Sequence, residues 1–128
     1  MYNDILNSDD PLSTSNAVHS VCVKIAEIIT EKFKPTNITP VIHMHSVYGS
    51  PDYGEIMNVT AVNSLGNYIN ATVDICVKLG KINDQTELVY IQECVNSKGI
   101  VEDRRASYVS DFSIAKAASL TFKFLNKK

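Results

Sequence analysis

A strict alternation of apolar and polar residues runs from Tyr68 to Leu79. Because successive side chains of a β-strand point to opposite faces, this pattern gives the strand one apolar face and one polar face. The apolar positions are Ile69, Ala71, Val73, Ile75, Val77 and Leu79. The polar positions are Asn70, Thr72, Asp74, Cys76 and Lys78. Such a strand covers a core on one side and meets water or a partner on the other, so the stretch predicts an antiparallel sheet packed on one face.

Segments with helical spacing flank the predicted sheet. From Ser15 to Pro35 apolar residues recur at intervals of three and four, which predicts an N-terminal helix that the proline ends. A second helix is expected to begin at Ser110 or Asp111, because either residue can cap it. We interpret the polar residues 1–14 as a flexible N-terminal arm and residues 15–128 as a single α+β domain.

Four further strands are expected between the two helices, at Thr39–Tyr48, Glu55–Asn63, Thr86–Val95 and, as an edge strand, Ile100–Tyr108. The connections between them are short and rich in Gly, Asn, Asp and Ser, which favours antiparallel hairpins. The predicted fold class is therefore α+β. It consists of an N-terminal helix, a four- to five-stranded antiparallel meander sheet and a C-terminal helix packed on one face of the sheet.

The composition narrows the classes of partner. The net charge is −2, so no long-range positive field would attract nucleic acid or anionic lipid. No apolar run is long enough to span a membrane, and the three separated cysteines lack zinc-binding spacing. We expect a cytoplasmic protein without a membrane partner or a nucleic-acid partner. The excess of lysine over arginine fits AT-rich codons and a phage or viral source, in which case the location would be the host cytoplasm.

His43 and His45 are the sharpest local signal for chemistry. On a strand, residues two apart project from the same face, so both imidazoles could bind one metal ion. A third ligand would have to come from the next hairpin, where Glu55 and Asp52 are the candidates. The alternative is that both histidines only decorate the outer face of the sheet. No cofactor other than this divalent metal is suggested by the sequence.

Two other groups of residues could bind a ligand. Arg104 and Arg105 are the only arginines, and a guanidinium binds carboxylate or phosphate through two parallel hydrogen bonds. The alternative is that they balance the acidic residues beside them on an edge strand. Tyr48 and Tyr53 flank a Gly/Pro-bearing loop and could form an aromatic contact surface, or could simply cover the base of the turn.

No nucleophile motif and no glycine-rich phosphate loop occurs in the chain. We therefore expect a small non-enzymatic binding or assembly protein, a homo-oligomer that binds a protein partner or a small anionic ligand. The alternative function is a metal-dependent enzyme that uses the two strand-borne histidines. A nucleic-acid-binding module is the third hypothesis.

Overall fold

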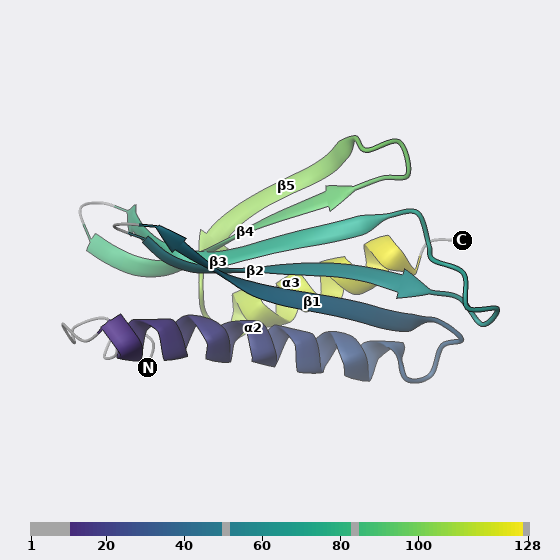
Figure 1. The fold of residues 1–128 in the computed structure, drawn as a ribbon, viewed down its shortest axis with the longest axis horizontal. Coiled ribbons are helices and arrows are strands. Elements are labelled where there is room, and N and C mark those ends of the chain that lie inside the picture. The colour runs from purple at the N-terminus through teal and green to yellow at the C-terminus, as the bar shows by residue number, and fades with distance from the viewer. Residues whose placement is uncertain (1–10, 50–51, 83–84, 127–128) are drawn as a thin grey trace.

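The chain folds into one antiparallel sheet with two helices on the same face (Figure 1). The structure is a computed structural model that describes residues 11–49, 52–82 and 85–126. The elements are helix α2 (Pro11–Phe33), strands β1 (Thr39–Gly49), β2 (Asp52–Val62), β3 (Thr72–Ile82), β4 (Gln85–Val95) and β5 (Val101–Tyr108), and helix α3 (Asp111–Leu125). The strands follow one another in sequence order across the sheet. The predicted α+β fold is confirmed, with five strands in the meander.

The apolar face of β3 packs against the helices as the alternation predicts. Val73, Ile75 and Val77 are fully buried, whereas Asp74 and Cys76 on the other face stay partly accessible. Helix α2 packs on β1, β2 and β3, and α3 packs on β2, β3 and β4 and on α2 itself. Among the described residues, no helix is long and apolar enough to cross a membrane.

Several predicted boundaries are wrong, and two of them differ by four residues. The third strand begins at Thr72 rather than Tyr68, although the alternation continues upstream. The amide of Ile69 still donates to the carbonyl of Ala61, but the amide of Ala71 donates to the carbonyl of Ile69, a tight local turn that interrupts the ladder. Helix α2 begins at Pro11, since a proline fits the first helical turn, where its missing amide is not needed. Residues 11–14 thus belong to the helix, and residues 1–10 lie outside the described part.

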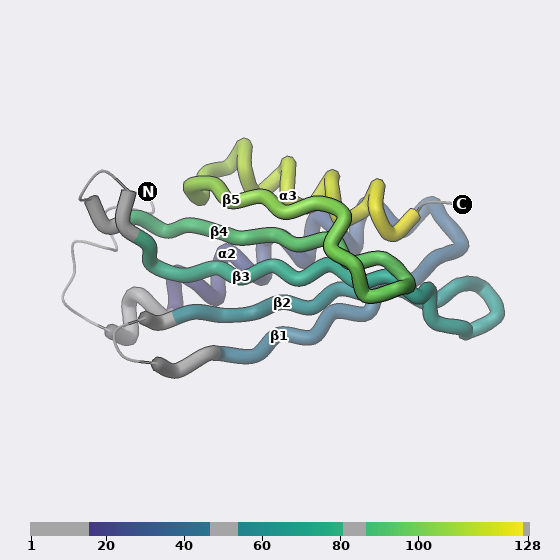
Figure 2. The backbone as a smooth tube through the Cα atoms, turned by 90° about the horizontal axis from the view of Figure 1, so that it is seen from above, coloured from purple at the N-terminus to yellow at the C-terminus, as the bar shows by residue number. Residues whose placement is uncertain are grey.

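Strand β5 and helix α3 are neighbours along one side of the molecule (Figure 2). Strand β5 pairs with β4 and forms one edge of the sheet. Helix α3 begins immediately after β5, and a reciprocal capping box between Ser110 and Ser113 fixes its first turn. This short connection sets the helix beside the edge strand and leaves space between them for a site.

Candidate functional site

The predicted metal ligands lie on opposite faces of the sheet. His43 and His45 are exposed on the outer face of β1. Glu55 pairs with Ser46 in the β1–β2 hairpin, so its side chain points to the helix-covered face, where the residue is only 6% exposed. No group of three or more His, Cys, Asp or Glu side chains in the described ranges could hold a metal ion. The structure therefore does not bring the three predicted ligands together. The hairpin register explains this separation. Ser46 and the two histidines alternate along β1 and so point to opposite faces, and Glu55 shares the face of its partner Ser46.

Glu55 instead binds a histidine of helix α2. The Nδ1 atom of His19 donates to both carboxylate oxygens of Glu55, at 2.9 and 3.0 Å. Burial, reinforced by the negative charge of Glu55, raises the pKa of the neighbouring Cys22 thiol to about 12. At neutral pH this thiol is protonated, and the residue is buried, so it is not a nucleophile. Sequence reasoning did not connect His19 with Glu55, which lie far apart in the chain.

The two tyrosines of the predicted aromatic surface face each other in the backbone register. Tyr48 pairs with Tyr53 across the β1–β2 hairpin. Their side chains, and that of Asp52, lie outside the described part of the structure. The hypothesis of an aromatic binding loop therefore stays a prediction.

The two arginines lie on β5, and each has an acidic neighbour. The Nε atom of Arg105 donates to Asp103 Oδ2 at 3.1 Å. Arg104 Nε lies 3.7 Å from Glu93 Oε2 on strand β4. Because Arg105 pairs with the buried Gln92, it belongs to the helix-covered side of the sheet. Arg105 therefore faces the space between β5 and α3, whereas Arg104, which pairs with Glu93, belongs to the outer face.

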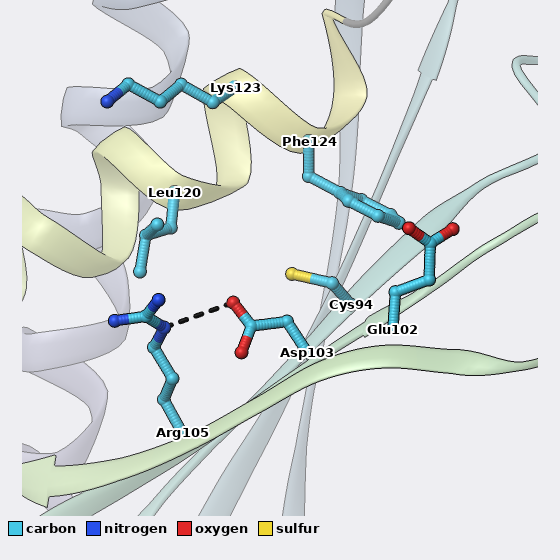
Figure 3. Close-up of a pocket in the computed structure, with 7 residues that line it drawn as sticks. All are labelled: Cys94, Glu102, Asp103, Arg105, Leu120, Lys123 and Phe124. Atoms are coloured by element: carbon cyan, nitrogen blue, oxygen red, sulfur yellow. Dashed lines mark hydrogen bonds and ion pairs between the residues drawn. The ribbon is translucent and has the colours of Figure 1, made fainter.

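Two hollows lie between β5 and α3, and Arg105 lines both. The first, which we call the cationic hollow, has a volume of about 410 Å³. Its principal lining residues are Tyr90, Arg104, Arg105, Ser107, Phe112 and Lys116. The second, the mixed-charge hollow, has a volume of about 360 Å³. Besides Arg105 it is lined by Cys94, Glu102, Asp103, Leu120, Lys123 and Phe124 (Figure 3).

The two hollows differ in charge. Arg105 and Lys116 line the cationic hollow, and none of its described lining residues is acidic. Arg104 also lines it, but the Arg104 side chain pairs with Glu93 on the outer face of the sheet. In the mixed-charge hollow, Glu102 and Asp103 offset Arg105 and Lys123. Figure 3 shows Asp103 and the Arg105 guanidinium together above β5, with Leu120 and Phe124 reaching down from α3. The cationic hollow is therefore the better candidate for an anion.

The nearest carboxylate of α3 is engaged elsewhere. Asp111 lies one residue before Phe112, and its Oδ1 accepts a hydrogen bond of 3.2 Å from Lys24 of α2. No carboxylate in the described part of the chain pairs with Lys116. At the floor of the hollow, burial raises the pKa of Tyr90, and the nearby Arg105 partly opposes this shift. The Tyr90 hydroxyl thus stays protonated and can donate a hydrogen bond.

Of the predicted site residues, Arg104 and Arg105 are the pair that the structure places beside a hollow with further cationic and aromatic groups. Sequence reasoning missed Phe112, Lys116 and Tyr90, because nothing in their local pattern links them to β5. Comparison with protein-family models, with curated proteins and with solved structures finds no match to this chain.

Proposed function

We propose that this protein is a small non-enzymatic binding and assembly protein that holds a small anionic ligand in the cationic hollow. The observation that carries the proposal is that Arg105 of β5 and Lys116 of α3 line one hollow whose described lining contains no carboxylate. In a protein of net charge −2, such a local excess of positive charge is most simply explained by an anionic ligand.

Arg105 is the proposed anchor of the ligand. Its Nε atom is held by Asp103, which fixes the plane of the guanidinium and leaves the two terminal nitrogens for an end-on contact. Two parallel N–H donors match the two oxygens of a carboxylate or a phosphate group. Lys116, on the opposite wall, would add a second positive charge from α3.

Phe112 indicates the rest of the ligand. Its ring lines the hollow and is 77% exposed, an unusual state for a phenylalanine at the start of a packed helix. A flat apolar group could stack on this ring while its anionic group reaches Arg105. The proposed ligand class is therefore a phosphate or carboxylate attached to an aromatic group, of which a nucleotide is one example.

The lining also favours binding over catalysis. It offers positive charges, hydroxyl groups and an aromatic ring, but none of its described residues is a histidine, a cysteine or a carboxylate that could act as a base or nucleophile. His19 is bound to Glu55, and His43 and His45 lie on the other face of the sheet.

The test is isothermal titration of the purified protein with AMP and with phenyl phosphate. The Arg105→Ala and Lys116→Ala variants should each weaken binding by ~10- to ~100-fold, because a hydrogen bond to a charged group contributes ~1.5–3 kcal/mol. The Lys123→Ala variant is the matched control. It removes the same charge from the same helix but lines the mixed-charge hollow, so its affinity should be unchanged.

Failure of the wild-type protein to bind either probe, or equal losses for Lys116→Ala and Lys123→Ala, would contradict the proposal. Binding of an acidic peptide in place of both probes would move the function to recognition of a protein segment.

A further inference from the structure

We propose that the free edge of β5 pairs antiparallel with β5 of a second copy of this chain, so that two sheets join into one. The inference rests on the assembly part of the proposed function and names its surface. Three features of the edge support it: its freedom from other partners, its exposed apolar ends and the order of its charges.

Strand β5 has only one neighbour in the sheet. It pairs with β4, and no described strand pairs with its other side. Such an edge presents unpaired N–H and C=O groups that can accept another strand. Helix α3 packs on β2, β3 and β4, so it lies beside β5 without covering this edge (Figure 2).

Exposed apolar side chains mark both ends of β5. Val101 at its start is 45% exposed, and Tyr108 at its end is 41% exposed. Val101 pairs with Val95, and Tyr108 pairs with Val89, so both lie on the outer face of the sheet. In an antiparallel pair of β5 strands, the start of each strand lies near the end of the other, so Val101 of one copy comes near Tyr108 of the other without lying directly opposite it.

The charges of β5 are complementary to themselves when the strand is reversed. Two acidic residues, Glu102 and Asp103, precede two basic residues, Arg104 and Arg105. Antiparallel pairing of identical strands therefore brings the acidic part of one strand to the basic part of the other, and opposite charges that face one another across a sheet stabilise the pairing. A uniformly acidic or basic peptide would match only half of this strand, which is why a second copy is the favoured partner.

A two-fold axis perpendicular to the sheet fixes the register further. It keeps each residue on the same face in both copies, and opposite residues of an antiparallel pair share a face, so their numbers differ by an even amount. Asp103 can then lie opposite Arg105 of the second copy, with the reciprocal pair on the other side of the axis. The two Arg104 residues meet at the axis on the outer face, where Glu93 of the adjacent β4 offsets each charge.

The test is the mass in solution, measured by sedimentation over a micromolar concentration series. The wild-type protein should have twice the mass of one chain. The Asp103→Arg and Arg105→Asp variants should each be monomeric, because each sets like charges against one another across the axis. An equimolar mixture of these two variants should recover the dimer. One variant carries arginine at positions 103 and 105 and the other carries aspartate at both, so opposite charges face one another again.

The control is His45→Arg, which adds a charge to the other edge strand, β1, and should leave the dimer intact. Thermal unfolding of every variant checks that the monomers are folded. A monomeric wild-type protein, or an Asp103→Arg variant that remains dimeric, would overturn the inference. Titration with AMP separates the two proposals. Lys116→Ala should lose the ligand and keep the dimer, whereas a wild-type monomer that binds AMP contradicts the strand pairing and the assembly part of the proposed function but not the ligand site.

Discussion

His19 and Glu55 join helix α2 to strand β2 by a hydrogen bond across the helix–sheet interface. The Nδ1 atom of His19 lies 2.9 Å from one carboxylate oxygen and 3.0 Å from the other. The partners differ in exposure, because the His19 side chain is 59% exposed and that of Glu55 only 7%. A buried carboxylate is costly unless it is hydrogen-bonded, so the bond from the exposed histidine offsets part of the cost of burying Glu55.

His19→Ala should lower the free energy of unfolding by ~1–3 kcal/mol, because Glu55 would keep its burial and lose this donor. Urea denaturation followed by circular dichroism measures the change. His43→Ala is the matched control: it removes an exposed histidine from the outer face of β1 and should stay within ~0.5 kcal/mol of the wild-type value. Equal effects of the two substitutions would mean that the bond to Glu55 contributes nothing to stability.

Cys22 makes the stability depend on pH in the alkaline range. Its pKa rises from 9.0 to about 12 in the folded protein, mainly through burial. Between these values the unfolded chain releases a proton that the folded chain retains, so the free energy of unfolding falls as pH rises from about 9 towards 12. The Cys22→Ala variant should show a shallower decline in urea titrations at pH 8 to 10.5. Parallel slopes for the two proteins would contradict the assignment.

Gln92 gives a prediction about the buried contact between β4 and α3. Its Nε2 donates to the carbonyl of Ala117 at 3.0 Å and to Thr121 Oγ1 at 2.8 Å, whereas its Oε1 has no partner among the described residues. Gln92→Glu would replace the donor by a buried carboxylate facing two acceptors and should destabilise the fold by ~3–5 kcal/mol. Gln92→Met removes the unpaired oxygen at similar volume and should cost less than ~1.5 kcal/mol. Thermal unfolding ranks the two variants, and a reversed order would contradict the reasoning.

The fold could be predicted because its main signal is local. The alternation around Val73, Ile75 and Val77 identifies a strand with one buried face, and the structure buries these three residues completely. The start of the same strand was misplaced for a physical reason. Tyr68 to Ala71 keep the alternating pattern, but the local bond between Ala71 and Ile69 takes the backbone out of the ladder. Periodicity does not report which backbone partner an amide selects.

The candidate site could be predicted only in part. The arginines stood out as the only two in the chain, yet the groups that complete the hollow come from β4 and α3. Lys116 and Phe112 meet Arg105 because of the path of the helix relative to the edge strand, which depends on tertiary packing. Glu55 does not join His43 and His45, since the hairpin register sets it on the opposite face of the sheet. That register could have been read from the short turn between β1 and β2.

Phe112 should matter for ligand binding and not for stability. Its ring is 77% exposed, so Phe112→Ala removes little buried area and should change the free energy of unfolding by less than ~0.5 kcal/mol. If the ring stacks on the aromatic part of a ligand, the same substitution should weaken phenyl phosphate and AMP by ~5- to ~10-fold, near the lower end of measured stacking energies. The affinity for inorganic phosphate, measured by competition, should be the same in this variant as in the wild-type protein. Inorganic phosphate has no ring, and Arg105 and Lys116 remain to bind it. The control is Leu65→Ala, which removes another exposed apolar side chain, in the β2–β3 connection. It should leave the affinity for phenyl phosphate and for AMP unchanged. An equal loss for inorganic phosphate and phenyl phosphate would show that Phe112 shapes the hollow rather than stacking on the ligand.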